Sequence, residues 1–200
     1  MEILRVVERL KSKENWRVVR LKDVVETRRE IVNPRQLDPS TPYAYVGLEH
    51  IMPGELLLRR FGKAASVKSP KLRFYKGNIL YGRLRPYLDK VVVATINGIC
   101  STDIIVLNVK AEYVMPALLV LVLHSTRFIR HATKTMRGTD RPRVTWSSLA
   151  DFTLTLPPLG EQKEITDILF TFEKLRDLYS KQLEKLDRIK RGLTDLILSS

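Results

Sequence analysis

Apolar residues change their spacing near residue 158, and the two sides of this boundary predict different structures. Before it, short apolar runs alternate with glycine or proline, a pattern typical of short β-strands joined by turns. The runs are YAYVGLEHI (43–51), GELLLRRFG (54–62), GNILYGRL (77–84), DKVVVATI (89–96) and DIIVLNV (103–109). Strand and helix signals are mixed in WRVVRLKDVV (16–25), and helices are predicted for residues 3–11 and 112–133. A polar loop is predicted for TKTMRGTDRPRVTW (133–146) and a final strand for LADFTLTLPP (149–158).

Beyond Pro158, one uninterrupted helical pattern runs to the end of the chain. Its apolar residues alternate three and four apart, with only Gln182 breaking the series, which is the heptad pattern of a coiled coil. We call this stripe the seam; it consists of Ile165, Ile168, Phe172, Leu175, Tyr179, Leu186, Ile189, Leu193 and Leu196. Two prolines end the preceding strand because proline offers no N–H to a ladder, and Glu161 favours the first helical turn through the helix dipole.

The length of this helix bears on what covers the seam. From Glu161 to Leu198 the helix would measure about 57 Å, which is too long to bury the whole seam against one domain of this size. The pattern favours a coiled-coil partner, and a helix folded back on its own domain is the alternative. The predicted fold class is α+β: a globular mixed α/β domain over residues 1–158, followed by a long coiled-coil helix over residues 159–200.

Composition narrows the class of protein. The chain has 200 residues, 44% of them hydrophobic, and no apolar run approaches the roughly 20 residues of a membrane span. Its first residues contain acids and no small-residue cleavage site, so we expect no signal peptide and a cytoplasmic protein. The single cysteine, Cys100, excludes an internal disulfide and a multi-cysteine zinc site, and its apolar neighbours predict plain burial.

Charge is divided as unevenly as the hydrophobic pattern. Residues 1–150 hold 27 Lys+Arg and 13 Asp+Glu, a net charge of +14, whereas residues 151–200 hold 8 and 9, a net charge of −1. Residues 56–90 carry ten basic side chains and one acid, and residues 127–143 carry six and one. This imbalance favours a polyanion, most often nucleic acid. An idle basic surface is the alternative, and a membrane is disfavoured because the basic residues lie among strands and turns.

The C-terminal part of the chain resembles a known family. The run GTDRPRVTWSSLADFTLTLPPLGEQKEI (138–165) is similar to the end of a target recognition domain and the conserved helix that follows it in the DNA specificity subunit of type I restriction-modification systems. NWRVVRLKDVV (15–25), KGNILYGRL (76–84) and ICSTDIIVLNV (99–109) resemble the family's domain start, glycine-turn strand and serine-containing strand. The resemblance covers nearly the whole chain and is strongest over residues 137–198.

The resemblance implies a function and a set of partners. A specificity subunit holds a methyltransferase subunit, and in larger assemblies a restriction subunit, on a defined sequence of double-stranded DNA. Family members usually carry two recognition domains and two conserved helices, whereas this chain has room for one of each and resembles a half-subunit. It is therefore expected to form a homodimer through the seam and to read an interrupted palindrome.

Candidate DNA contacts follow from the resemblance and the charge. Lysines and arginines would neutralise phosphates, while the guanidinium groups of Arg83 and Arg85 and of the 137–143 loop would grip guanine O6 and N7. A phosphate contact is the alternative for each reader, and core packing is favoured for Tyr81 and Tyr87 over stacking. The full candidate set is Arg59, Arg60, Lys63, Lys68, Lys71, Arg73, Lys76, Tyr81, Arg83, Arg85, Lys134, Arg137, Thr139, Arg141 and Arg143.

The sequence disfavours an enzyme acting alone. VNPRQ and STPYAY lack the second proline of a DNA methyltransferase motif, and no glycine-rich cofactor turn is evident. Asp151, Glu161 and Lys163 mimic the spacing of a nuclease metal site, but the latter two begin the long helix, and the three histidines (His50, His124 and His131) lack metal-ligand spacing. We therefore expect no catalytic residues, no metal and no cofactor. A scaffold indifferent to DNA would explain the helix but not the charge, and a general DNA-binding protein remains an alternative.

Overall fold

The computed structural model describes residues 15–37 and 43–198, so the helix predicted for residues 3–11 lies outside the described part of the chain. The strands are β1 (Arg17–Arg20), β2 (Val25–Arg28), β3 (Ile31–Val32), β4 (Ala44–Val46), β5 (Gly62–Lys63), β6 (Lys71–Phe74), β7 (Ile79–Gly82), β8 (Val91–Val93), β9 (Gly98–Cys100), β10 (Ile104–Val109) and β11 (Thr153–Leu156). The α-helices are α2 (Leu21–Val24), α3 (Pro116–Leu123), α4 (Thr126–Thr135), α5 (Trp146–Leu149) and α6 (Leu159–Leu198), and short 3₁₀ turns lie at η1 (Pro34–Gln36), η2 (Leu48–His50), η3 (Ala64–Ser66) and η4 (Pro86–Leu88).

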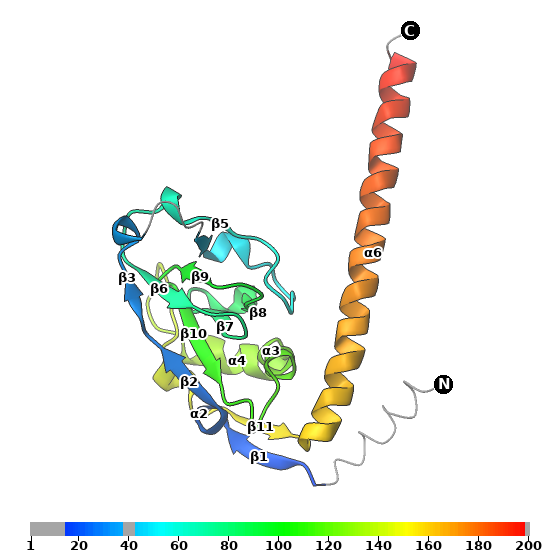
Figure 1. Cartoon of the computed structure of the whole chain (residues 1–200). Coiled ribbons are helices and arrows are strands. Elements are labelled where there is room, and N and C mark those ends of the chain that lie inside the picture. The colour runs from blue at the N-terminus through cyan, green and yellow to red at the C-terminus, as the bar shows by residue number, and fades with distance from the viewer. Residues whose placement is uncertain (1–14, 38–42, 199–200) are drawn as a thin grey trace.

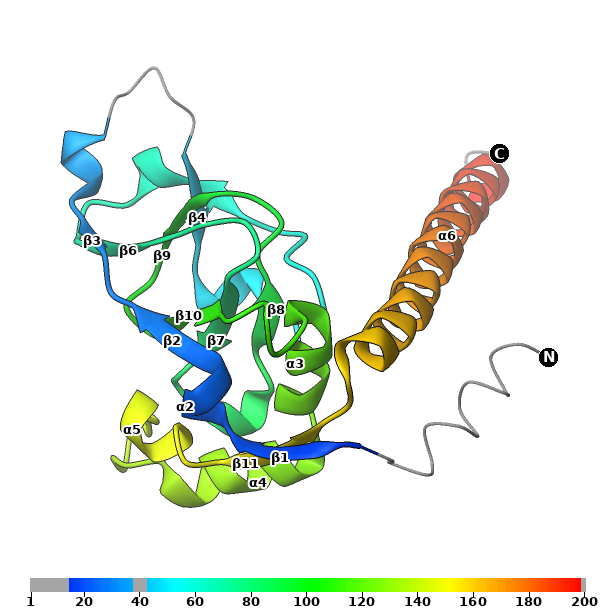
Figure 2. The same cartoon turned by 60° about the horizontal axis from the view of Figure 1, so that its bottom comes forward.

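The strands form three sheets. Antiparallel neighbours in the order β2-β10-β7-β8 make a central sheet, and a second sheet has the order β3-β6-β9-β4-β5, in which β4 and β9 run parallel. Strands β1 and β11 pair antiparallel as a separate ribbon, with Arg17 opposite Leu156 and Arg20 opposite Thr153. Figure 1 shows this ribbon at the base of the domain, beside the start of α6, and Figure 2 shows it from a second direction.

Strands β7 and β8 of the central sheet are buried on both faces. Alternate residues of a strand point to opposite sides, so each strand contributes to two core clusters. Ile79 and Tyr81 pack into one core cluster together with α3 and α4, including Leu119 and Phe128. Leu80, between them in the chain, belongs to a second cluster shared with the neighbouring sheet. The domain is therefore layered as helices, central sheet and second sheet, and Cys100 is fully buried in the second cluster, as its apolar surroundings predict.

Several elements differ from the sequence prediction. The helix expected over residues 112–133 is two helices, because the chain breaks at His124 and restarts at Ser125, whose hydroxyl caps α4 by accepting from Phe128 N at 3.2 Å. The run 54–62 is a loop up to β5. Its leucines supply core side chains, and its backbone meets β8 through a bridge from Leu57 to Val93. The charged strand β6 was not predicted.

The long helix α6 begins within two residues of the predicted start and projects away from the domain (Figure 1). Ile165 and Leu169 pack against the first core cluster. From Phe172 onward the seam is exposed; Phe172 is 57% and Leu186 61% accessible. The alternative of a seam folded back on its own domain is therefore wrong for this part of the helix. No helix in the described ranges is long and apolar enough to cross a membrane.

Candidate nucleic-acid interface

The two arginine-rich loops that the sequence singled out lie side by side. The first follows β7, and the second connects α4 to α5. Arg85 N donates to Pro142 O at 2.9 Å and Val144 N donates to Arg83 O at 3.0 Å, with Leu84 bridging to Arg143. The loops therefore form a single surface, which we call the loop junction (residues 83–85 and 137–144).

The second loop is a small hairpin with an exposed tip. Arg137 and Arg143 exchange two backbone hydrogen bonds of 2.8 Å, so the residues between them are held as a turn. Gly138 has φ +102°, a conformation that glycine adopts without steric cost. Thr139 and Arg141 at the tip are exposed. A narrow hairpin of this kind is the size of element that enters a major groove.

The arginines of the loop junction divide into two groups. Arg143 donates from Nε to Asp103 Oδ1 at 2.8 Å, and this hydrogen bond, with the carboxylate charge, raises the pKa of Arg143. Arg83 donates from Nε to Val144 O at 3.2 Å. These two half-buried side chains hold the loops together. Arg85, Arg137 and Arg141 are instead exposed, and Arg85 donates to Asp140 O at 3.5 Å across the junction.

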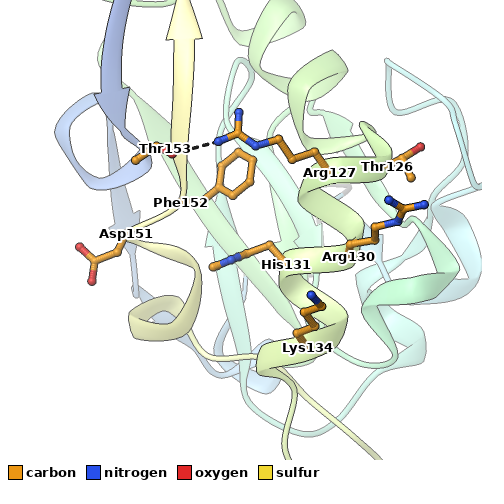
Figure 3. Close-up of a pocket in the computed structure, with 8 residues that line it drawn as sticks. All are labelled: Thr126, Arg127, Arg130, His131, Lys134, Asp151, Phe152 and Thr153. Atoms are coloured by element: carbon orange, nitrogen blue, oxygen red, sulfur yellow. Dashed lines mark hydrogen bonds between the residues drawn. The ribbon is translucent and has the colours of Figure 1, made fainter.

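Basic residues on α4 surround a hollow of about 620 Å³ (Figure 3). Arg127, Arg130 and Lys134 recur three and four residues apart, which puts them on one face of the helix. Arg127 donates to Thr153 Oγ1 at 3.0 Å and lies 5.1 Å from the centre of the Phe152 ring. These contacts fix the position of the guanidinium group without neutralising its charge.

The acid at this hollow does not offset the positive charge. Asp151 accepts from Lys22 Nζ at 2.7 Å, and this contact, reinforced by Arg20 at 3.5 Å, lowers the pKa of Asp151. The carboxylate is thus already paired outside α4. Lys134 lines a second hollow together with Arg137 of the loop junction, so the basic face of α4 continues into that junction.

Sequence reasoning included Lys134 in the candidate set but left out Arg127 and Arg130. The signal was present, because residues 127, 130 and 134 follow the spacing of one helix face. It was overlooked because the predicted helix ended at residue 133, which divided the stripe between a helix and a loop.

Several candidate DNA contacts occupy other places. Tyr81 is 4% exposed and packs edge-on against Phe128 with ring centres 5.7 Å apart; burial raises the pKa of its hydroxyl. Lys71 is 7% exposed and donates to Ser69 O at 3.0 Å. Neither side chain reaches the surface, so the inclusion of Tyr81 and Lys71 among the DNA contacts is wrong, whereas the packing favoured for Tyr81 is confirmed. The packing favoured for Tyr87 is wrong, since Tyr87 is 48% exposed.

The remaining candidates lie outside the loop junction. Arg59 pairs with acids of α6, and Arg73 pairs with Glu30 at 2.7 Å, so both charges are already matched. The exposed members are on β5 and on loops around the second sheet; they are Arg60, Lys63, Lys68 and Lys76. The structure thus unites the 83–85 and 137–143 candidates but does not bring all of residues 56–90 to the same surface.

The residues considered for catalysis have structural contacts. Glu161 accepts from Trp16 Nε1 at 3.0 Å, and His131 Nε2 lies 3.0 Å from Ser148 O. His124 lies 2.7 Å from Asp89 and 3.0 Å from the carbonyl of Glu55. Within the described residues, no three histidine, cysteine, aspartate or glutamate side chains are grouped so as to hold a metal ion.

A layered α+β domain followed by a long projecting helix is the architecture that the chain shares with known proteins. Residues 13–188 match the family described as the type I restriction modification DNA specificity domain, and the chain belongs to this family. It is 32% identical over 133 residues to the EcoDI specificity subunit of Escherichia coli, covering 66% of this chain and 29% of that protein. The putative MjaX specificity subunit of Methanocaldococcus jannaschii is 24% identical over 191 residues, or 90% of this chain and 44% of that protein.

Solved structures show the same relationship. The HsdS subunit from Thermoanaerobacter tengcongensis superimposes with a TM-score of 0.67 at 27% identity, over 82% of this chain and 44% of that one. A type I restriction-modification system solved to explain its complex assembly gives a TM-score of 0.67 at 25% identity, over 86% of this chain and 45% of that one. The chain therefore spans less than half the length of these relatives.

Proposed function

We propose that this chain recognises one short sequence of double-stranded DNA through the loop junction. The observation that carries the proposal is the joining of the two arginine-rich loops into one braced surface. Arg83 and Arg143 hold the loops, so the exposed Arg85, Arg137 and Arg141 are positioned before DNA arrives. A guanidinium group can grip guanine O6 and N7 with two hydrogen bonds, and prior positioning lowers the entropic cost of binding.

The face of α4 supplies contacts that do not depend on sequence. Arg127 to Lys134 spans about 10 Å of helix, which matches about three phosphates of one DNA strand at roughly 3.4 Å each along the axis. Because this face continues into the loop junction, a duplex read by the junction has its backbone beside α4. Phosphate contacts there would set the register in which the junction meets the bases.

The proposed division of labour follows the architecture. Residues 1–158 act as the target recognition domain, and residues 159–200 as the helix that docks a methyltransferase subunit and, in larger assemblies, a restriction subunit. Two copies pair through the seam to rebuild the arrangement of a full-length specificity subunit. The chain itself performs no catalysis and needs no cofactor, and it acts in the cytoplasm.

Selection of DNA from a random pool tests this function. The purified chain is mixed with the pool, with and without a methyltransferase subunit from the same system, and bound molecules are sequenced. We expect one short half-site in both cases. Recovery of DNA without any shared sequence would contradict the proposal and indicate a general DNA-binding protein. Recovery of no DNA in either arm would indicate a scaffold that does not bind DNA.

A further inference from the structure

The base of α6 is tied to the domain by a buried side chain. Gln162 is 1% exposed; its amide nitrogen donates to Tyr113 O at 2.8 Å and Pro157 O at 2.9 Å, and its oxygen accepts from Met115 N at 2.9 Å. Ile165 and Leu169 pack on the core beside it. This contact holds the beginning of the helix, but a helix held at one end is free to pivot.

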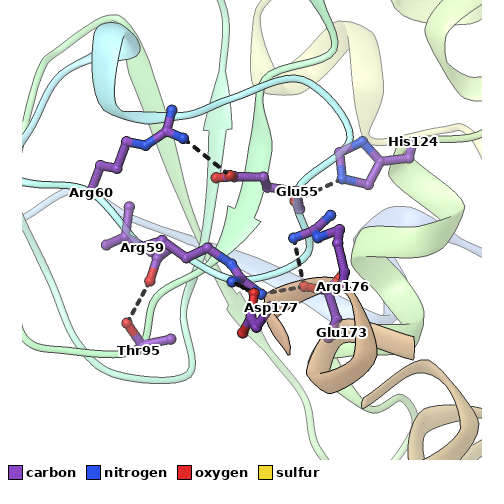
Figure 4. Close-up of polar contacts among 9 residues, drawn as sticks. Glu55, Arg59, Arg60, Thr95, His124, Glu173, Arg176 and Asp177 are labelled. Atoms are coloured by element: carbon purple, nitrogen blue, oxygen red, sulfur yellow. Dashed lines mark hydrogen bonds and ion pairs between the residues drawn. The ribbon is translucent and has the colours of Figure 1, made fainter. Parts of the chain in front are cut away.

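A second tie lies farther along the helix and is made of charges (Figure 4). Arg59, from the loop before β5, donates to Glu173 Oε2 at 2.6 Å and also bonds Asp177. Arg176 contacts the same glutamate at 2.7 Å. The Glu173 side chain is only 10% exposed, so its charge is poorly screened by solvent and depends on these partners.

The arrangement of the two acids explains why they need Arg59. Glu173 and Asp177 are four residues apart on one helix face, where like charges repel. Gln162 and Thr166, both buried, lie on the same face, so a polar stripe meets the domain beside the apolar contact of Ile165 and Leu169. From Phe172 onward the apolar seam lies on a neighbouring face and is exposed. Arg59 supplies the cation that lets this polar stripe lie against the domain.

The loop that carries Arg59 is itself held firmly. Leu58 N donates to Val93 O at 2.9 Å, and Val93 N donates to Leu56 O at 2.8 Å. Thr95 Oγ1 donates to Leu58 O at 2.8 Å, and both leucines are buried. Arg59 therefore projects from a fixed backbone, and the guanidinium group reaches α6 without depending on a mobile loop.

We propose that Arg59 is a positioning residue that fixes the direction of α6 relative to the recognition domain. Gln162 and the 173–177 stretch are about 20 Å apart along the helix, and two separated ties define a direction where one does not. A helix of 40 residues is about 60 Å long, so a swing of about 10° would move its far end by about 10 Å. That displacement equals about three base pairs of duplex.

The effect of Arg59 on the spacing of DNA half-sites rests on the proposed function, whereas its effect on the direction of α6 does not. If two copies pair along α6, the direction of the helix sets the distance between the two recognition domains. Arg59 would then determine the spacer between half-sites without touching DNA. This role explains why a residue of the basic 56–90 stretch is turned away from the loop junction.

The variant Arg59→Met tests the claim, because methionine keeps much of the aliphatic stem and removes the charge. Arg60→Met is the matched control, since Arg60 is the next residue and lies 3.9 Å from Glu55 of its own loop, not beside α6. Spin labels at Lys68→Cys and Lys190→Cys report the distance between domain and helix; Cys100 is fully buried and stays unlabelled. Glu173→Gln with Asp177→Asn removes the same tie from the helix side.

Labelled protein is diluted in an excess of unlabelled protein, so that only distances within one chain are read. We then expect a single narrow distance in wild type, a clearly broader distribution in Arg59→Met and an unchanged distribution in Arg60→Met. Arg59→Glu should broaden it further, and Arg59→Glu with Glu173→Arg and Asp177→Arg should restore it. An unchanged distribution in both Arg59→Met and the Glu173→Gln, Asp177→Asn protein would overturn the proposal, whatever DNA does.

The same proteins are then used to select DNA. Wild type should choose one spacer length, and Arg59→Met should choose the same half-site bases with the spacer preference reduced about fivefold, the effect of a coupling at the low end of the usual range. Loss of half-site preference in wild type would instead remove the proposed function, and the distance measurement would still decide the role of Arg59. A broader distance with an undiminished spacer preference would overturn the link to spacing.

Discussion

Arg85 adopts a backbone conformation that is unusual for its residue type. Its φ of 49° and ψ of 67° lie in the left-handed region, where a side chain with a Cβ is strained by about 1–2 kcal/mol. The conformation turns the chain into η4, and the hydrogen bond from Arg85 N to Pro142 O holds it. Strain retained at an exposed arginine beside a proposed binding surface is consistent with a role in recognition.

Arg85→Gly separates the side chain from the backbone, because glycine adopts left-handed φ freely. We expect the variant to fold with undiminished thermal stability, and to lose about 1–3 kcal/mol of binding at one base position if the guanidinium makes a bidentate contact. Titrations against a panel of half-sites with single base changes measure this. Equal weakening on every sequence would assign Arg85 to a phosphate, and Arg141→Ala at the hairpin tip provides the comparison.

Cys100 should be inert in the folded protein. Burial raises the pKa of its thiol to about 12, so at pH 8 only about one thiol in 10⁴ is ionised, and the reactive form is the thiolate. We expect no alkylation by iodoacetamide at pH 8 under native conditions and complete alkylation in denaturant, measured by mass spectrometry. Rapid modification of native protein would mean that the second core cluster opens readily.

At the scale of elements, regular apolar spacing predicted the helix whose position and start are set by residues close together in the sequence. The heptad spacing located α6, and Pro157 and Pro158 located its start, because both signals act within a few residues. The single helix expected over residues 112–133 was wrong because apolar residues continue across the break, and only the capping Ser125 marks it. Strand β6 was missed because Lys71 and Arg73 interrupt its apolar pattern, although Lys71 is buried in the fold.

The candidate site was predictable in composition but not in geometry. The arginines of residues 83–85 and 137–143 were singled out from charge and resemblance, yet their meeting depends on a bridge between Leu84 and Arg143, which are far apart in the chain. The bracing role of Arg143 likewise depends on Asp103, which no local pattern connects to it. Long-range pairs of this kind arise from the packing of the whole domain.

The basic face of α4 should contribute to the salt dependence of binding. Changing Arg127, Arg130 and Lys134 together to glutamine should reduce the slope of log K against log salt by about 2.7, or about 0.9 for each lost phosphate contact, with base preference unchanged. The matched control changes Lys63, Lys68 and Lys76 to glutamine; these residues lie on β5 and on loops around the second sheet. An equal reduction in the control would show that α4 holds no privileged contact.

The exposed seam of α6 should decide the oligomeric state. Leu175→Glu with Ile189→Glu puts two charges into the seam, and each would be buried without a partner in a coiled coil. We expect light scattering at micromolar concentration to give twice the chain mass of 23.1 kDa for wild type and the single mass for this variant. Lys181→Glu with Arg188→Glu changes charge off the seam and should remain dimeric. A monomeric wild type would remove the dimer from the proposed function.

At the scale of the whole molecule, a dimer predicts the symmetry of the DNA target. Two recognition domains related by a twofold axis read inverted half-sites separated by an unread spacer. The length of α6, about 60 Å, limits the separation of the half-sites to about 18 base pairs. DNA selection by the wild-type chain should therefore return an interrupted palindrome within that limit. A single asymmetric site would indicate that one domain acts alone.

The pairing of β1 with β11 also bears on how such a protein changes over evolution. The chain enters and leaves the domain on adjacent antiparallel strands, so residues 21–152 form one continuous segment whose two ends lie side by side. A segment of this kind can be replaced as a unit by recombination, and Gln162 would still find its acceptors, because they are backbone carbonyls at positions 113 and 157. Arg59 differs from these backbone groups, because it contacts α6 through its side chain. A replacement module keeps this contact only if it carries a suitable side chain at position 59. New DNA specificities would then arise by exchange of residues 21–152. An exchange would keep the direction of α6 only where the new module also has a cation at position 59.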